Sequence, residues 1–177
     1  MAIGLGDARP LLGQFQSVSK NEAGFSVARS ERMTLITDIE LDDELQAWPQ
    51  YLDQAFLQWV RFFEVSPNRV GKLHATVHLI KDRERWQASG LLREVPFLEE
   101  GYQLGDQLFL VEQPSVFYRR MLFLHEATHW IMYRWLGGAG APWMMEGMAD
   151  YLSTHRFQDG AVELGYLPSS ADEVPYW

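Results

Sequence analysis

The sequence predicts a single α+β domain in which a small mixed or antiparallel sheet packs on helices. Its 177 residues fit one domain and are few for two. Hydrophobic residues make up 47% of the chain and charged residues 22%, which is typical of a chain that buries a core. Strands with interleaved helices come first and two adjacent helices come last, as in an α+β fold. We expect the domain to span residues 25–177, after a loosely ordered lead-in over residues 1–24.

The first elements follow from the spacing of apolar residues. β-branched residues around 25–27 and in Met33–Thr37 predict strands. After Asp42 the apolar residues recur at intervals of three and four, which is typical of an amphipathic helix packed on a core. Pro49 lies within this pattern, so the helix either kinks there or begins later. The apolar stripe consists of Leu45, Trp48, Leu52, Ala55, Trp59 and Phe62.

The middle of the chain predicts a strand, a short helix and a hairpin. Residues 72–80 alternate between polar and apolar side chains, as a half-buried strand does. Asp82 is suited to cap a short helix that ends at the next glycine. In the hairpin, Gly105 and Asp106 form the turn between residues 102–104 and Gln107–Val111.

Two consecutive helices are expected near the end of the chain. The first covers residues 114–136, with a proline near its start and Gly137 after its end. A short turn leads to the second, over residues 143–155. The last twenty residues contain two glycines and two prolines and are expected to form loops.

Composition excludes several classes of function. A formal net charge of −9 disfavours nucleic acid as a partner, because the phosphate backbone is also negative. The chain has no cysteine, which removes disulfides, thiol nucleophiles and thiolate metal sites. Its apolar runs are too short for a membrane span, so a soluble protein is expected. The first residues do not resemble a signal peptide, which leaves open a cytoplasmic protein and an exported one whose leader is removed. The oligomeric state stays open as well.

The segment from His125 to His129 reads His-Glu-Ala-Thr-His and lies within the longer predicted helix. Two residues four apart are separated by about 40° around a helix axis, so both imidazoles project from one face and can bind one zinc ion. Glu126 follows the first histidine, where its carboxylate can reach a metal-bound water without binding the metal. The apolar residues on both sides of this segment indicate a buried helix rather than a polar surface patch.

A catalytic zinc site needs a third protein ligand and an open position. The metzincin continuation, with Gly and His three and six residues after the second histidine, is absent. Glu146 lies 17 positions beyond His129, on the next helix, and is the better candidate. Asp150 lies one helical turn later and can accept a hydrogen bond from a zinc-bound imidazole. His155 is a rival ligand that is expected to face away.

These residues together resemble the gluzincins, the thermolysin-like clan of zinc metallopeptidases. The resemblance depends on HExxH followed by a helix with Glu-x-x-x-Asp. The form Trp143-x-x-Glu146-Gly147-x-Ala149-x-Tyr151 is similar to the peptidase-MA-like branch, which includes uncharacterised bacterial domains. The match is sharp over residues 122–152. A zincin-like fold is therefore expected.

The resemblance implies a role for each residue of the motif. His125, His129 and Glu146 would bind one Zn²⁺ per chain, Glu126 would be the general base, and Asp150 would orient a zinc histidine. Three tyrosines are possible oxyanion partners, although packing explains each as well: Tyr102, Tyr151 and Tyr166. The strand on whose edge a peptide or protein substrate would lie consists of Gln107, Leu108, Phe109, Leu110 and Val111.

Two further functions stay open. A non-catalytic zincin-like binding or scaffold module is the alternative to zinc-dependent hydrolysis of peptide bonds, because the segment after the second helix is short. Hydrolysis of a non-peptide amide by the same site is a third. His74 and His78 are expected to face solvent from their strand rather than to form a second metal site. Arg119 and Arg120 are expected on the exposed face of the long helix.

Overall fold

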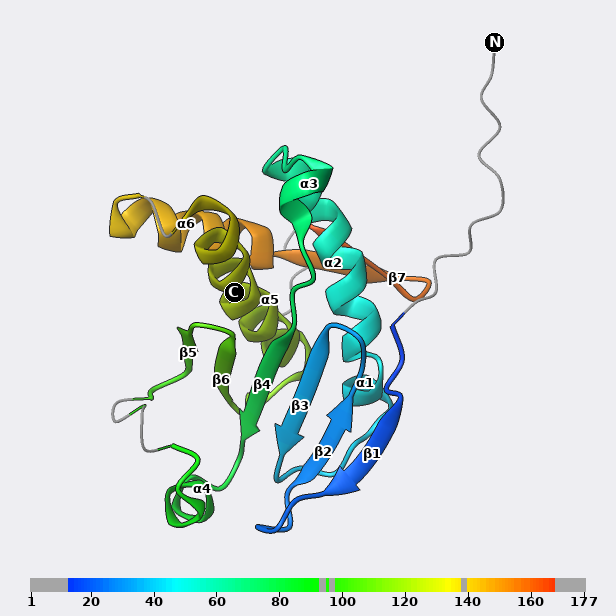
Figure 1. Cartoon of the computed structure of the whole chain (residues 1–177), viewed down its shortest axis with the longest axis vertical. Helices are drawn as coiled ribbons and strands as arrows, with labels where there is room; N and C mark the ends of the chain where they lie inside the picture. Colours follow the sequence, from blue (N-terminus) through cyan, green and yellow to red (C-terminus); the bar gives the residue numbers. More distant parts are fainter. Residues whose placement is uncertain (1–12, 93–94, 96–97, 138–139, 168–177) are drawn as a thin grey trace.

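The computed structural model describes residues 13–92, 95, 98–137 and 140–167 and contains a mixed six-stranded sheet (Figure 1). The sheet begins with antiparallel neighbours, then has two parallel pairings, and ends with an antiparallel hairpin. Its strands, in spatial order, are β1 (Ser17–Lys20), β2 (Ser26–Arg29), β3 (Met33–Thr37), β4 (Ala75–Ile80), β6 (Gln107–Val111) and β5 (Gly101–Leu104). The chain therefore has the mixed α+β character that its sequence predicts.

The lead-in expected over residues 1–24 contains a strand. Residues 17–20 form β1, which pairs with β2 in the register Ser17 to Arg29. Its four residues are all exposed, so the segment lacks the buried apolar face by which a strand is recognised in a sequence. Residues 1–12 lie outside the described residues.

Strand β6 is not the edge of the sheet, which corrects the expected position of a substrate strand. Its backbone pairs with β4 on one side and β5 on the other. The reason is the crossover from β4 through helix α4 (Arg83–Ser89). After it, the apolar second strand of the hairpin, β6, pairs in parallel with β4, and the first strand lies outside it. Leu108, Phe109 and Leu110 are therefore buried, and β5 is the edge strand.

The helices begin and end where local sequence signals place them. Asp82 caps α4 by accepting a hydrogen bond from the amide of Arg85, and Ser115 caps α5 (Val116–Leu136) in the same way from Tyr118. Pro49 lies in the first turn of α2 (Trp48–Phe62), so the later start is the correct alternative. The other helices are α1 (Asp43–Gln46), α2 (Trp48–Phe62), α3 (Pro67–Val70), α5 (Val116–Leu136) and α6 (Pro142–Ser153).

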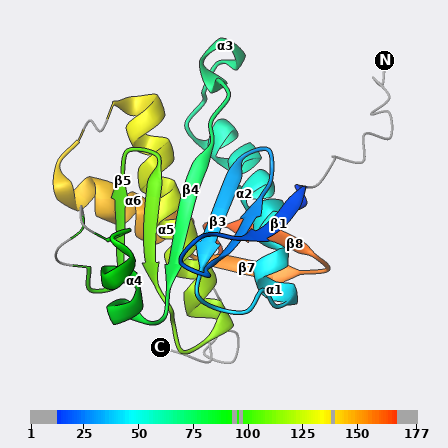
Figure 2. The ribbon, with the colours of Figure 1, turned by 60° about the horizontal axis from the view of Figure 1, so that its bottom comes forward.

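The two faces of the sheet bury different clusters. Figure 2 shows α2, α5 and α6 behind the sheet and α4 in front of it near one end. The larger cluster joins alternate residues of β3, β4 and β6 to α2 and α5, with Trp48 stacked on Phe123 at 4.4 Å between ring centroids. The smaller cluster packs Trp86 of α4 on Phe25 at 4.5 Å. Helix α5, which carries the histidines, is thus anchored in the larger core.

His78 does not face solvent, which corrects the expectation for this strand. Only 3% of its surface is exposed, because α4 covers the second face of the sheet. The imidazole stacks on Phe109 at 4.5 Å, and its Nε2 lies 3.1 Å from Oε1 of Gln107. Burial lowers the pKa of His78 from 6.5 to about 4. His74 is exposed, as expected.

The segment that follows α6 forms a hairpin, here called the terminal hairpin, where loops are expected, and residues 168–177 lie outside the described residues. Strands β7 (His155–Gln158) and β8 (Ala161–Leu164) pair with each other and lie against α2. The amide side chain of Gln58 accepts from the amide of Leu164 at 2.9 Å and donates to the carbonyl of Val162 at 2.8 Å. The side chain of Gln58 thus makes the main-chain hydrogen bonds to β8 that a neighbouring strand would otherwise make. Hydrophobic patterns in the sequence do not reveal such a contact.

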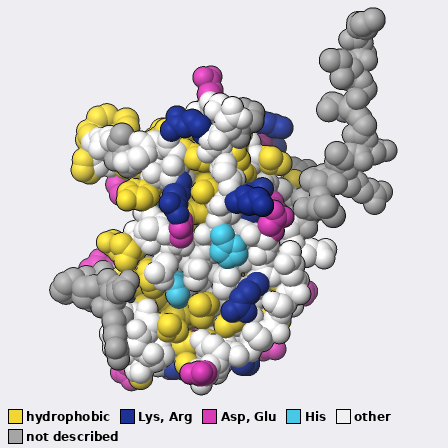
Figure 3. All heavy atoms as spheres, viewed as in Figure 1, with side chains coloured by type: hydrophobic (Ala, Val, Ile, Leu, Met, Phe, Trp, Pro, Cys, Tyr) yellow, Lys and Arg dark blue, Asp and Glu magenta, His cyan; other side chains and the backbone are white. Residues whose placement is uncertain are grey.

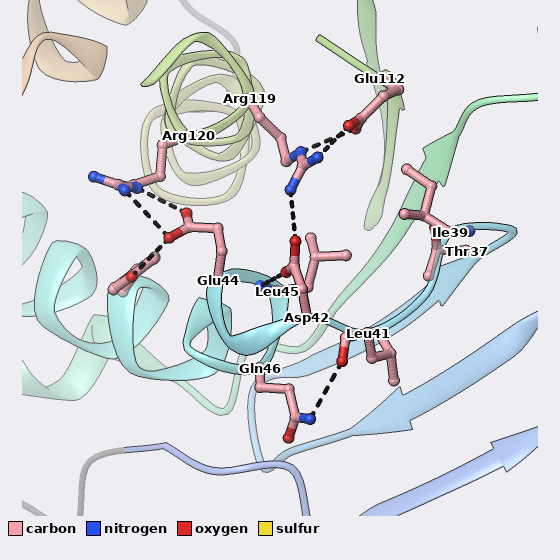
Figure 4. Close-up of polar contacts among 11 residues, drawn as sticks. Thr37, Ile39, Leu41, Asp42, Glu44, Leu45, Gln46, Glu112, Arg119 and Arg120 are labelled. Carbon is pink, nitrogen blue, oxygen red and sulfur yellow. Dashed lines mark hydrogen bonds and ion pairs between the residues drawn. The ribbon is translucent and has the colours of Figure 1, made fainter. Parts of the chain in front are cut away.

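Arg119 and Arg120 are not on an exposed face of α5. Figure 4 shows both guanidinium groups reaching from α5 toward carboxylates on neighbouring elements. Arg119 donates to Glu112 at 2.9 Å through Nε, and Arg120 donates to Glu44 of α1 at 2.7 Å. Asp42 lies 3.5 Å from Arg119. These partly buried ion pairs hold the first half of α5 against α1 and the end of β6.

No helix in the described residues is long and apolar enough to cross a membrane.

Candidate metal centre

Helix α5 places His125 and His129 on the side that faces α6. The opposite side of the helix is in the core, where Phe123, Ala127 and Trp130 are fully buried. Gly137 ends the helix in the left-handed conformation, and α6 begins at Pro142 and packs against α5. The two helices therefore meet along the face that carries the histidines.

His125, His129 and Glu146 converge on one point. The two Nε2 atoms are 3.1 Å apart, and Oε2 of Glu146 lies 3.4 Å from each of them. One potential ligand atom of each residue lies within 4.8 Å of the others, so the three form a group that could hold a metal ion. This confirms that the 17-residue spacing brings the carboxylate back to the histidines.

The spacing of these three atoms fits zinc. A tetrahedral site with ligand distances of about 2.0–2.2 Å has edges of about 3.3–3.6 Å. The observed separations of 3.1, 3.4 and 3.4 Å are close to these edges. Two imidazoles and one carboxylate are also a donor set that zinc accepts in catalytic sites, with a fourth position left for water or substrate. Burial and the neighbouring His125 lower the pKa of His129, which favours the neutral imidazole that a metal requires.

Asp150 supports His125 from the next turn of α6. Its Oδ1 lies 3.2 Å from Nδ1 of His125, which confirms the contact expected from its position four residues after Glu146. An imidazole that donates from Nδ1 to a carboxylate presents the lone pair of Nε2 to the opposite side. Asp150 thus favours the tautomer of His125 that directs Nε2 toward His129 and Glu146. His155 is buried, stacks on Phe117 and lies outside this group.

Glu126 is buried beside the histidines and does not belong to the group formed by His125, His129 and Glu146. Its exposed fraction is 6%, and burial raises its pKa to about 8, with a further contribution from the negative charge of Glu146. A carboxyl group with a pKa near neutrality can take a proton and return it, which is what general acid–base catalysis requires. A bound cation would favour the ionised form.

Gly101 of the edge strand leaves the space that Glu126 occupies. A Cβ atom at this position would overlap the Glu126 carboxylate and would lie 2.8 Å from Cδ1 of Leu122. The side chain of Glu126 is the group most able to move, so any larger residue at position 101 displaces it. The backbone of β5 therefore sets the position of this carboxylate.

Gly101→Ala is expected to lower any hydrolysis by this site by about tenfold or more, because it moves the base while leaving the three ligand side chains in place. Zinc content and the melting temperature should change little. Gly147→Ala is the matched control: a Cβ there meets nothing within 4 Å, although Gly147 is next to Glu146. Full activity of Gly101→Ala in a steady-state peptide assay would contradict the placement of Glu126 by β5.

A cleft of about 920 Å³ opens over this centre. Its walls are β5 with the two residues before it, the exposed side of α5, and the face of α6 that carries Glu146 and Asp150. His125, Glu126 and His129 lie on its surface. The edge strand, the three potential ligands and the buried carboxylate thus face one space that can admit an extended chain.

The predicted oxyanion tyrosines have different positions. Tyr102 lines the cleft from β5. Tyr151 and Tyr166 are not among the residues that line it: the ring of Tyr151 packs toward Gly165 and Phe62, and the guanidinium of Arg156 lies 4.5 Å from the ring centroid of Tyr166. Both lie near the terminal hairpin, whose position the sequence did not reveal. Packing is therefore the better interpretation of these two residues.

Sequence reasoning missed several residues of the cleft wall. Tyr118 and Met121 line it from α5, two turns and one turn before His125, and Glu99 and Glu100 line it before β5. Helical spacing from His125 would have placed the first pair on the histidine face, whereas nothing in the sequence places the second pair near α5. At the other end of the centre, α6 leaves Trp143 78% exposed, and hydrophobic side chains gather over this helix in Figure 3.

Comparison of the chain with models of protein families, with curated proteins and with solved structures found no match. The site is therefore interpreted from its own geometry.

Proposed function

We propose that the protein is a zinc-dependent peptide hydrolase with a gluzincin-type site and a zincin-like fold. The observation that carries the proposal is the convergence of His125, His129 and Glu146 next to the buried, non-ligating Glu126, within one cleft. A structural zinc site is normally closed by four protein ligands, whereas this group offers three among the residues that the structure describes. An open position beside a carboxyl group of raised pKa is the arrangement that metal-assisted hydrolysis uses.

In this proposal each residue has one task. His125, His129 and Glu146 hold the zinc ion, which when bound supplies a Lewis acid that polarises the scissile carbonyl and lowers the pKa of water toward about 7. Glu126 accepts a proton from the attacking water and delivers it to the leaving nitrogen. Asp150 keeps His125 in the required tautomer.

The substrate strand in this proposal is β5, not β6. One side of β5 is paired with β6, and its other side is the free edge of the sheet, next to Glu126 at Gly101. An extended peptide can pair with such an edge through main-chain hydrogen bonds, which hold its carbonyls in a fixed register. Tyr102 also lines the cleft, but it pairs with Phe109, which packs in the cluster on the α4 side of the sheet, so its side chain points away from the histidines.

A zinc-binding module without hydrolytic activity is the second candidate. The observation that favours it is the location of Tyr151 and Tyr166 outside the cleft lining, which leaves few candidates for oxyanion stabilisation among the described residues. Such a module would use the same ligands and the same cleft to bind a partner.

Zinc content and chelator-sensitive hydrolysis separate the two candidates. We expect one zinc ion per chain by elemental analysis, cleavage of a broad library of quenched fluorescent peptides, loss of cleavage with a chelator, and recovery when zinc is restored. One bound zinc without chelator-sensitive cleavage would favour the binding module. Absence of stoichiometric zinc would contradict both.

A further inference from the structure

One row of residues on α5 follows the β5–β6 hairpin from end to end. At the first end, a Cβ at Gly101 would meet two members of the row, and at the turn the carboxylate of Asp106 accepts hydrogen bonds from the other two. Residues four apart share one helix face, and His125 and His129 each directly precede a member of the row. The row consists of Leu122, Glu126, Trp130 and Arg134. The hairpin therefore lies along α5 beside the potential metal ligands.

Asp106 joins the turn of the hairpin to the core side of α5. Its Oδ1 accepts a hydrogen bond from Nε1 of Trp130 at 2.8 Å, and Trp130 is fully buried in the larger cluster. Nε of Arg134 donates to the same oxygen at 2.7 Å. Burial raises the pKa of Asp106, but the hydrogen bonds from Arg134 and Trp130 outweigh this effect and hold the pKa below its usual value. The amide of Thr76 donates to the main-chain carbonyl of Asp106 at 2.8 Å, so the turn is tied to β4 as well.

The side chains of β5 between these two ends are directed elsewhere. Tyr102 pairs with Phe109, which packs on the α4 side of the sheet, so Tyr102 and, two residues later, Leu104 point away from α5. Gln103 lies on the α5 side, but its Nε2 donates to the carbonyl of Gly105 in its own turn at 2.6 Å. Strand β6 is anchored by the buried core, whereas the position of β5 depends on the contacts at its two ends.

We propose that Asp106 is a positioning residue that sets the distance of the substrate strand β5 from α5, and thereby the placement of a bound peptide at the metal centre. The inference rests on the proposed function, in which an extended peptide pairs with the free edge of β5. Asp106 is not among the residues that line the cleft, so it acts through Trp130, which directly follows His129. A peptide paired with β5 takes its position from the strand, and a displacement of about 1 Å at a reacting centre can lower a rate by about a hundredfold.

The test compares internally quenched peptides of different lengths around one cleaved bond. A peptide that pairs along the whole of β5 depends on the position of the turn, whereas one truncated at the end nearest the turn does not reach it. In the variant Asp106→Ala, we expect kcat/KM for the long peptides to fall by about tenfold, and that for peptides truncated at one end to change by less than about threefold. Zinc per chain should stay the same. A purely structural role of Asp106 would lower kcat/KM for long and short peptides alike.

Three further variants separate the hydrogen bond from charge and fold. Asp106→Asn keeps an oxygen acceptor for Trp130 and removes the charge, so kcat/KM for long peptides should stay within about threefold of the wild-type value. Trp130→Phe removes the same hydrogen bond from the other side and keeps an aromatic ring in the core, so it should reproduce the length-dependent loss even if Asp106→Ala folds poorly. Glu163→Ala is the matched control, because it removes a carboxylate that pairs with Arg156 in the terminal hairpin, outside the cleft lining. It should leave both classes of peptide unaffected.

Binding of labelled peptides to the Glu126→Gln protein, with and without Asp106→Ala, separates positioning from hydrolysis when it is followed by fluorescence anisotropy. A length-dependent loss of affinity supports the inference even where the wild-type protein cleaves nothing, in which case the proposed hydrolysis fails alone. Unchanged kcat/KM and affinity in Asp106→Ala, or an equal loss for long and short peptides, overturns the inference and leaves the hydrolysis intact. A loss in Asp106→Asn as large as in Asp106→Ala overturns it too, because the charge would then be the cause. Absence of peptide binding at every length overturns it together with the proposed function.

Discussion

Replacing Glu126 by glutamine is expected to lower peptide hydrolysis by about 10²-fold or more while the protein keeps its zinc and its fold. Glutamine has nearly the size of glutamate, so it fits the space that Gly101 leaves against β5. It cannot accept the proton of the attacking water. The three potential ligands are on other residues, and none of their mutual contacts involves Glu126.

Three measurements on the same preparation decide this prediction: kcat with a peptide that the wild-type protein cleaves, zinc per chain, and the melting temperature. Glu163→Gln is a suitable control, since Glu163 pairs with Arg156 on the terminal hairpin and lies outside the cleft lining. Unchanged kcat with bound zinc would mean that another group is the base. Loss of zinc together with activity would place Glu126 among the ligands instead.

The convergence of His125, His129 and Glu146 could be predicted from the sequence because the three residues lie on one helix and the helix that directly follows it. HExxH puts two imidazoles on one helix face by geometry alone, and a short turn between two helices limits where Glu146 can lie. The contact of Asp150 with His125 follows from the same helical period. The hairpin 101–111 was also predictable, since a glycine-led turn joins two segments of suitable length.

Features that depend on long-range pairing could not be predicted in this way. The alternation in β4 marks two faces, but it does not reveal that α4 covers the second face, and so His78 was expected in solvent. The order of β4, β6 and β5 is set by a crossover, which is why the edge strand was assigned to the wrong half of the hairpin. Strand β8 lies against glutamine side chains more than 100 positions earlier in the chain, a contact with no periodic signal.

The buried His78 is expected to make the protein lose stability as the pH falls from 6.5 to 4. In the folded protein burial lowers the pKa of this imidazole to about 4, whereas in the unfolded chain it titrates near 6.5. Between these values the unfolded chain binds a proton that the folded chain does not. The free energy of unfolding therefore decreases as the pH falls, by about 3 kcal/mol for this residue over the whole window. Above pH 6.5 the contribution is constant.

The variant His78→Gln isolates this effect, because glutamine can keep a hydrogen bond to Gln107 and does not titrate. Its lower packing against Phe109 is expected to reduce stability at every pH, so the informative quantity is the slope between pH 6.5 and 4 in denaturant titrations. The slope should be smaller than in the wild-type protein, and His74→Gln, which removes an exposed histidine before the same strand, should leave it unchanged. Other groups, including the buried His155, titrate alike in all three proteins and cancel in the comparison. Equal slopes for His78→Gln and the wild-type protein would show that the second face of the sheet admits water or a proton at His78, and that α4 does not seal it.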